Sequence, residues 1–356
     1  MNKTKTRNFD IFYNLVKRHL LVFLNNKIRL FYTLLVPIII LAVYVLFLRE
    51  LEITSVQSAL EPYFKEYGAL NIHKEEFMKN IMVLVDSWML SGIVTLSTIT
   101  VSLQTNNTFV EDKENGVNRD FISSPINKNI LISSYFVFNF IISFLICFVV
   151  VLIAFLYLAI NKEFYFDFVD FISIVVVLLV NVILNTLITV FICIFIKSSS
   201  TLSAIIAMFS TAIGFLIGAY MPISMLPIWV RNLCAFFPST YGCGLMRYAF
   251  LSAPLSNLND FLINNSIMSQ AEVTRLFEEL NNGFGYNIKF FDVSVNPQWQ
   301  SLIVIVSIFV FLILNVIFGG KLTIVDDGFK KIKKESKKIN DKLKNSISGK
   351  SEDKTH

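Results

Sequence analysis

Charged residues are scarce in this sequence: they make up 16 % of its 356 residues, whereas hydrophobic residues make up 54 %. A soluble domain of this length has too little interior to bury so much apolar surface. The apolar residues gather in runs of about 20, the length that crosses a hydrocarbon core of about 30 Å. The short alternating segments that an outer-membrane barrel needs are absent. The sequence therefore predicts an all-α polytopic membrane protein.

Cysteine and histidine are also rare, with four and three residues. Cys147 and Cys193 lie inside apolar runs and are interpreted as small packing residues. Cys234 and Cys243 fall together on an expected external segment, so a disulfide between them stays open. The histidines lie far apart and form no ligand pattern with the cysteines, so we expect no metal site.

Motifs for nucleotide binding and catalysis are missing as well. No G-x-x-x-x-G-K-[ST] sequence is present, and Gly319-Gly320-Lys321 lacks both the first glycine and the following hydroxyl. Neither G-x-S-x-G nor H-E-x-x-H occurs. We therefore expect no catalytic residue and no cofactor in this chain. If the chain moves a substrate against its gradient, the energy must come from a partner protein or from a coupled ion.

Six apolar runs are long enough to span a membrane. We expect these spans at about residues 28–48, 81–103, 131–160, 171–196, 201–220 and 300–318. Before them, residues 9–23 place apolar side chains at helical spacing opposite a polar, basic face, which indicates an amphipathic helix in the membrane interface. Residues 221–256 are apolar but interrupted by prolines and glycines, which favours short re-entrant helices between spans five and six.

The positive charges predict the orientation. Most of the 31 Lys and Arg residues fall in the N-terminus, the 104–130 loop, Lys197 and the C-terminal tail. By the positive-inside rule, both termini then lie in the cytoplasm. The expected regions are a cytoplasmic N-terminus (1–27), a transmembrane domain (28–320) with external segments 49–80 and 221–298, and a basic cytoplasmic tail (321–356).

Few polar groups lie inside the expected spans. The second span is rich in Ser, Thr and Gly, which favours a place inside the bundle. Asp86, near the outer start of this span, is interpreted as a helix-start or vestibule residue, with a substrate path as the alternative. Asn181 and Asn185 share one helical face; interhelical hydrogen bonding explains them, and lining a substrate path is the alternative. An ion-coupled carrier would therefore lack a proton relay.

Two stretches carry recognisable motifs. In the charged loop, E-D-K-E-N-G at residues 111–116 precedes S-S-P-I at residues 123–126. Later, G-x-x-x-P at 218–222, L-P-x-W at 226–229 and P-x-x-Y at 238–241 are followed by Arg247. In this order, and with six spans, they resemble the membrane permeases of the ABC-2 type exporters.

The resemblance implies the permease subunit of an ATP-driven exporter that moves an amphipathic, lipid-like, drug or peptide substrate out of the cell. Two permeases, identical or homologous, would pack side by side in a bacterial cell membrane. Each would dock on a separate cytoplasmic ABC ATPase subunit, which would bind ATP and Mg²⁺. Membrane lipids would be the other partners, and no nucleic acid is expected.

The resemblance also implies two functional segments. The charged loop would carry a coupling helix whose mixed charges suit a surface contact with the ATPase, through Glu111, Asp112, Glu114, Gly116, Arg119, Phe121 and Pro125. The proline-rich segment would form an outer gate from Gly218, Pro222, Pro227, Trp229, Pro238, Tyr241 and Arg247. In this gate, Trp229 and Tyr241 would be interfacial anchors, and Arg247 would pair with an external acid or a lipid phosphate.

Two functions of other classes stay open. A membrane-embedded enzyme acting on a lipid-linked substrate would need external or interfacial acid–base residues, and no arrangement singles any out. A non-transporting sensor or scaffold subunit would bind a peptide through its external segments.

Overall fold

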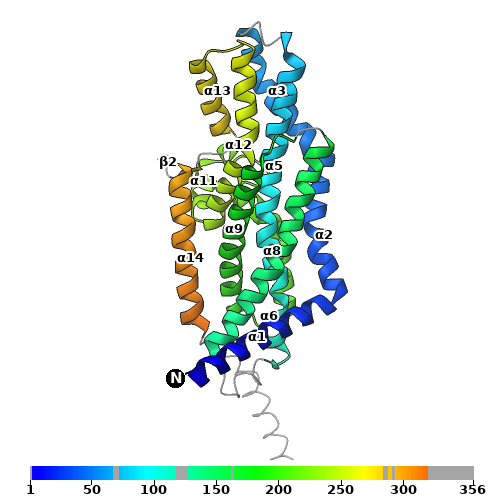
Figure 1. Ribbon diagram of the computed structural model, residues 1–356, viewed down its shortest axis with the longest axis vertical. Helices are drawn as coiled ribbons and strands as arrows, with labels where there is room; N and C mark the ends of the chain where they lie inside the picture. The colour runs from blue at the N-terminus through cyan, green and yellow to red at the C-terminus, as the bar shows by residue number, and fades with distance from the viewer. Residues whose placement is uncertain are drawn as a thin grey trace, which may run out of the picture.

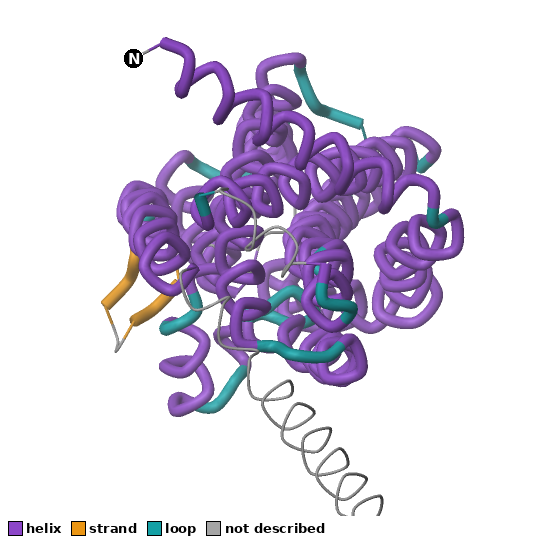
Figure 2. Tube along the Cα trace, turned by 90° about the horizontal axis from the view of Figure 1, so that it is seen from below, coloured by secondary structure: helices purple, strands orange, loops and turns teal. Residues whose placement is uncertain are grey.

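The computed structural model describes residues 2–66, 72–117, 127–161, 164–283, 288–290 and 293–319. This part of the chain is almost entirely helical, with one antiparallel hairpin of two short strands (Figures 1 and 2). In chain order the elements are α1 (Asn2–Asn25), α2 (Lys27–Val43), the π-helix η1 (Tyr44–Leu48), α3 (Arg49–Glu66), α5 (Lys74–Thr105), α6 (Asn107–Glu114), α8 (Lys128–Ile160), α9 (Phe168–Phe195), α10 (Ser199–Leu216), the 3₁₀ helix η2 (Ile223–Met225), α11 (Ile228–Ala235), α12 (Pro238–Asn264), α13 (Gln270–Gly283), β1 (Ile288–Phe290), β2 (Val293–Val295) and α14 (Pro297–Gly319).

Six helical segments of the described chain are long and apolar enough to cross a membrane. They are Lys27–Ser58, Lys74–Glu114, Lys128–Ile160, Phe168–Phe195, Ser199–Leu216 and Pro297–Gly319. The protein is therefore an all-α polytopic membrane protein, as its sequence predicts.

Helix α5 is the centre of the bundle and packs against α2, α8, α9, α10 and α12 (Figure 1). In its most apolar window 94 % of the residues are buried, compared with 17 % for α10 and for α14. The hydroxyls of Thr95 and Ser97 on it donate to the carbonyl four residues earlier, so these two buried groups are paired within the helix. The prediction that this span is internal is confirmed.

The two ends of the bundle differ. At one end α1 crosses the bundle close to α6, and we call this the α1 end; at the other, α3 and α13 project beyond the spans (Figure 1). The projecting helices share an apolar core with α5 and α12, which includes Leu60, Phe77, Leu258 and Leu276.

The first span does not stop at residue 48. The π-helix η1 joins α2 to α3 without a break, so the helical path continues from Lys27 to Glu66. Single turns of π-helix occur frequently at functional sites. This turn brings Tyr44 to a buried position against α5.

The segment after α10 is less broken than its glycines and prolines suggest. Helices η2 and α11 are short, but α12 runs for 27 residues through Gly242, Gly244 and Pro254. A Cβ atom at Gly242 would collide with the Asn181 side chain, and one at Gly244 with Gln300. The expectation of short helices throughout is therefore wrong for α12, because these glycines allow close helix packing rather than ending the helix.

Candidate functional site

Helix α6 continues the central helix α5 at the α1 end, with Asn106 between them. It has eight residues, and one face of it is buried against the bundle. The ring of Phe109 lies 4.6 Å from that of Tyr135 on α8, centroid to centroid. This apolar contact holds α6 so that its charged residues, Glu111 to Glu114, meet neighbouring helices.

Asp112 binds two helices at once. Its carboxylate accepts hydrogen bonds of 2.6 and 2.9 Å from the Arg18 guanidinium on α1, and one of 2.7 Å from the Tyr135 hydroxyl. The Asp112 side chain is 9 % exposed, so its end of the bidentate pair is largely shielded from water. The hydrogen bonds donated to Asp112 raise the pKa of the Arg18 guanidinium above its usual value. Arg18 therefore stays charged at any pH at which the fold persists.

His19, next to Arg18, is fully buried under the same contact. Its ring stacks on Tyr135 at 4.0 Å, and its Nε2 lies 3.2 Å from the Ser134 hydroxyl. Burial, reinforced by the positive charge of Arg18, lowers the pKa of His19 to about 4. At neutral pH the ring is therefore uncharged, with Nδ1 free to accept from Arg18 and Nε2–H donating to Ser134.

Lys113 points inward and closes the end of α9. Its ammonium group donates to the carbonyl oxygens of Cys193, Ile194 and Ile196 at 3.0, 2.8 and 2.6 Å. These carbonyls lie at the C-terminal end of α9, which carries partial negative charge, and that of Cys193 also accepts from the Ile196 backbone N–H. The ammonium group is thus fully hydrogen-bonded although the residue is only 5 % exposed.

The two glutamates of α6 bind further helices. Glu111 pairs with Arg29 on α2, and Arg29 also donates to the Thr108 hydroxyl at 2.9 Å. Glu114 is exposed and accepts from the Ser199 backbone N–H and hydroxyl at 2.9 and 2.6 Å, at the N-terminus of α10. We call Glu111–Glu114 with these partners the α6 junction; it joins α6 to α1, α2, α8, α9 and α10.

The sequence placed all the charges of this loop on a surface that faces a partner. The structure turns Asp112 and Lys113 inward and leaves Glu114 exposed. Gly116 follows α6 with φ of +77°, the left-handed region that glycine adopts at helix ends. Arg119, Phe121 and Pro125 lie outside the described residues.

Sequence reasoning missed Arg18 and Tyr135 as partners of Asp112, and it missed the contact of Lys113 with the end of α9. Arg18 lies 94 residues from Asp112, so no local pattern connects them. Arg18 was counted with the polar, basic face of an interfacial helix, whereas its side chain turns toward the carboxylate of Asp112.

Two predicted gate residues meet near the other end of the bundle. The Arg247 guanidinium on α12 donates to the carbonyl of Gly218, which follows α10 with φ of +71°. The guanidinium also lies over the ring of Trp88 on α5, 4.8 Å from its centroid. Arg247 is 1 % exposed, so the expected pairing with an external acid or a lipid phosphate is wrong for this conformation.

The remaining gate residues lie in the turns that shape this segment. Pro222 and Pro227 immediately precede η2 and α11, and Pro238 is in the first turn of α12, where a missing N–H leaves no bond unmade. Trp229 on α11 is 72 % exposed, as an interfacial anchor requires. Tyr241 is buried instead, and its hydroxyl donates to the Ala235 carbonyl at 2.8 Å, so its side chain is not at the membrane surface.

The predicted path residues all bind other helices. Asp86 is fully buried and pairs with Arg49 at 2.9 Å, while the Tyr44 hydroxyl donates to it at 2.7 Å. Asn181 donates to the Gly242 carbonyl at 3.0 Å. Asn185 donates to the Thr98 hydroxyl and accepts from that of Ser239, at 2.7 and 2.6 Å.

A comparison with known protein families matches the part of the chain that contains these contacts. Residues 11–251 match the family model described as ABC-2 type transporter, which is more than half of the chain. The chain belongs to the ABC-2 type transporter family. No curated protein matches it. The match includes the α6 junction and the contact between Gly218 and Arg247, and it makes this protein a membrane component of an ABC transporter.

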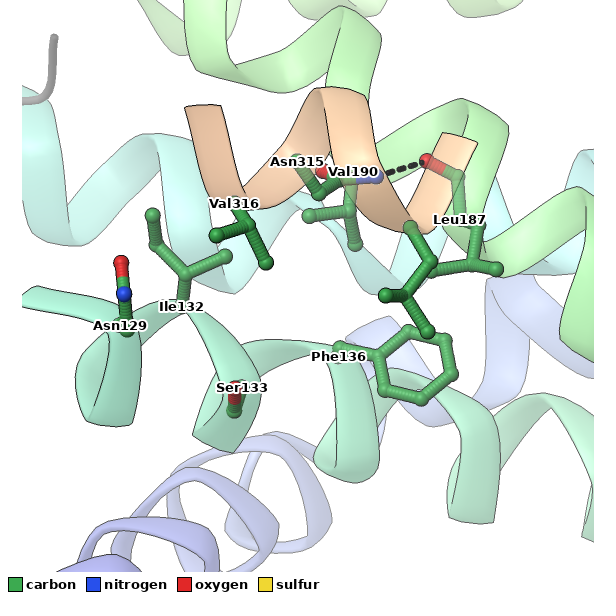
Figure 3. Close-up of a pocket in the computed structure, with 9 residues that line it drawn as sticks. Asn129, Ile132, Ser133, Phe136, Leu187, Val190, Asn315 and Val316 are labelled. Atoms are coloured by element: carbon green, nitrogen blue, oxygen red, sulfur yellow. Dashed lines mark hydrogen bonds between the residues drawn. The ribbon is translucent and has the colours of Figure 1, made fainter. Parts of the chain in front are cut away.

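This ABC-2 permease has a lateral groove between α8, α9 and α14 toward the α1 end (Figure 3). The groove has a volume of about 180 Å³ and mainly apolar walls, including Ile132, Phe136 and Val190. Asn315 bridges two helices here by donating to the Leu187 carbonyl at 2.9 Å. None of the residues predicted for the substrate path lines this groove.

Proposed function

We propose that this chain is the permease of an ATP-driven exporter and that it is coupled to a separate ATPase subunit through the α6 junction. One observation carries the proposal: four consecutive residues of a short helix, Glu111–Glu114, contact five other helices. A displacement of α6 cannot be absorbed locally, because it would break buried charged contacts. It would instead be transmitted to α1, α8 and α9.

The division of charges within α6 supports this coupling. Asp112 and Lys113 are buried and fixed to the permease, whereas Glu114 is exposed at the same helix end. A helix that transmits movement needs one side bound to the membrane-spanning helices and another side free to contact the partner. ATP and Mg²⁺ are bound by the partner ATPase in this proposal.

Helix α1 supports a membrane location with the α1 end in the cytoplasm. Its buried side is formed by Leu15, Val16, His19 and Phe23. Other apolar side chains on it are exposed, and these face lipid in the proposed arrangement: Phe9, Tyr13, Leu21 and Leu24. The positive-inside rule gives both termini the same side. We assign the protein to a bacterial cell membrane, beside a second permease that is either identical or homologous.

The test is a mild-detergent pull-down of the tagged chain from its native membrane, assayed for ATP hydrolysis. The wild type is expected to retain an ATPase. A variant with Glu114→Lys and Phe121→Ala is expected to lose it, because both changes fall on the segment assigned to docking. The matched control is Asp10→Lys, the same charge reversal on an exposed residue of α1 outside the α6 junction, which is expected to retain the ATPase. If no ATPase accompanies the wild type in any mild detergent, the exporter proposal fails, and an enzyme or a sensor becomes the better explanation.

A further inference from the structure

Arg247 is a buried cation with few partners. It is 1 % exposed, and within the described part of the chain it donates one hydrogen bond, to the Gly218 carbonyl. Its Nε has no hydrogen-bond partner among the described residues, and no carboxylate within the described ranges forms an ion pair with it. A charge held this way is costly, since burial removes its water without supplying an opposite charge.

Other buried or half-buried cations of the described chain have the partners that Arg247 lacks. Lys113 is also buried, but its ammonium group makes three short hydrogen bonds. Arg18 and Arg49 each bind a carboxylate. Arg247 is therefore an exception within the same chain, and an ionisable residue kept in such a position is a reason to look for a ligand.

The surroundings of Arg247 suit a ligand that arrives when the gate opens. The planar guanidinium is positioned by the face of Trp88, which orients its N–H groups without using them. The cover is the turn after α10, which supplies the Gly218 carbonyl and approaches α5 at Gly92. The turn itself is buried, but α10, from which it extends, is mostly unburied in this chain, so a displacement of α10 would carry the turn away from Arg247.

We propose that Arg247 is the recognition residue for the anionic head of an amphipathic cargo, which it binds when the Gly218 turn moves away. A guanidinium offers paired N–H donors that match the two oxygens of a phosphate or a carboxylate. The apolar surroundings, which include Leu96, Ile213 and Ile217, suit an alkyl body behind that head. This assignment rests on the exporter function proposed above and narrows its cargo to amphipathic anions.

Trp88 provides the assay. The chain has three tryptophans, and the other two, Trp229 and Trp299, are 72 % and 62 % exposed. Replacing both with phenylalanine leaves Trp88 as the single emitter, in contact with the proposed site. The full-length chain in nanodiscs of zwitterionic lipid would be titrated with dodecyl phosphate and with dodecanoate. We expect a saturable change in Trp88 emission with at least one of these anions, and none with dodecyltrimethylammonium or with inorganic phosphate alone.

Two arginine variants decide whether Arg247 is responsible. Arg247→Gln is expected to weaken binding at least tenfold, and Arg231→Gln, an equal charge change on neighbouring α11, is expected to leave it unchanged. No response to either anion, or an unaltered affinity in Arg247→Gln, overturns the proposal. Equal affinity for inorganic phosphate would overturn the amphipathic cargo. These titrations need no ATPase, so their failure is distinct from failure of the pull-down.

Two further variants test the cover and the fold. A Cβ atom at Gly92 would lie 2.8 Å from the Ala219 carbonyl oxygen, so Gly92→Ala should displace the turn and strengthen anion binding. Weaker binding in that variant would contradict the role of the turn. Arg247→Met should not lower the melting temperature, because it removes a charge that lacks an opposite partner. A clear fall would identify Arg247 as a structural cation instead.

Discussion

The contact between Asp112 and Arg18 is expected to hold α1 on the bundle, and Asp112→Asn tests this directly. The substitution keeps the shape of the side chain and an acceptor for Tyr135, but it sets an amide N–H₂ against the Arg18 guanidinium. Hydrogen bonds to charged groups contribute about 1.5–3 kcal/mol each, and losing one partner of a buried ion pair costs about 3–5 kcal/mol. The Arg18 side chain is 33 % exposed, so water replaces part of what is lost. We therefore expect α1 docking to weaken by about 2–3 kcal/mol.

Amide hydrogen exchange of the full-length chain in nanodiscs measures this change at α1 itself. A loss of about 2–3 kcal/mol accelerates exchange about 30- to 150-fold if α1 detaches locally. The matched control is Glu111→Gln, which removes the neighbouring pair with Arg29. The Glu111 side chain is 37 % exposed, so its loss should cost less than about 1 kcal/mol, or about fivefold in exchange at the start of α2. Equal effects of the two variants would refute the argument that burial makes the Asp112 contact the stronger one.

The other predictions concern single positions. His19 has a pKa of about 4 when α1 is docked and about 6.5 when α1 is free. Its contribution to docking is therefore present above pH 6.5 and is lost as the pH falls toward 4. Amide hydrogen exchange of α1 should accelerate over that pH range, and His19→Gln should make the exchange rate less dependent on pH. Gly218→Ala forces a side chain into the left-handed region and against Ile223, so the melting temperature should fall by the equivalent of about 1–3 kcal/mol. Asp86→Asn breaks the buried pair with Arg49 and should accelerate exchange in η1 more than in α14; equal acceleration would contradict a local role.

The spans could be predicted because hydrophobic length is a local property. A run of about 20 apolar residues has few alternatives to a membrane helix, and the expected spans correspond to helices of the structure. The internal position of α5 was also readable, since Ser, Thr and Gly are conspicuous in an otherwise apolar segment. The length of helix α12 could not be predicted, because a glycine that ends a helix and one that permits close packing look alike in sequence. Only the contact of Gly242 with Asn181 distinguishes them.

The sequence predicted a charged segment after the second span, and α6 lies in this segment. The sequence could not tell that Asp112 and Lys113 face inward, because α6 is only two turns long and gives little periodicity. Asp86 was interpreted as a helix-start or vestibule residue, whereas α5 already begins at Lys74 and the structure buries Asp86 completely. Its partner Arg49 lies 37 residues earlier, beyond any local pattern.

The contacts of Asp86 and Asp112 follow one scheme, and this restricts how the permease moves. Both lie on the continuous path of α5 and α6, each binds an arginine from the N-terminal helices, and each accepts from a tyrosine of α8, Tyr157 at 3.4 Å and Tyr135 at 2.7 Å. At 1.5 Å per residue the two carboxylates are roughly 40 Å apart, about the thickness of a bilayer with its headgroups. Helices α5 and α8 are thus joined at two points about one bilayer thickness apart and are expected to tilt together when α6 is displaced. The end of α10 and the turn after it are joined to α12 by hydrogen bonds from Thr240 to the Leu216 carbonyl and from Arg247 to the Gly218 carbonyl, so such a tilt is expected to act on these two contacts.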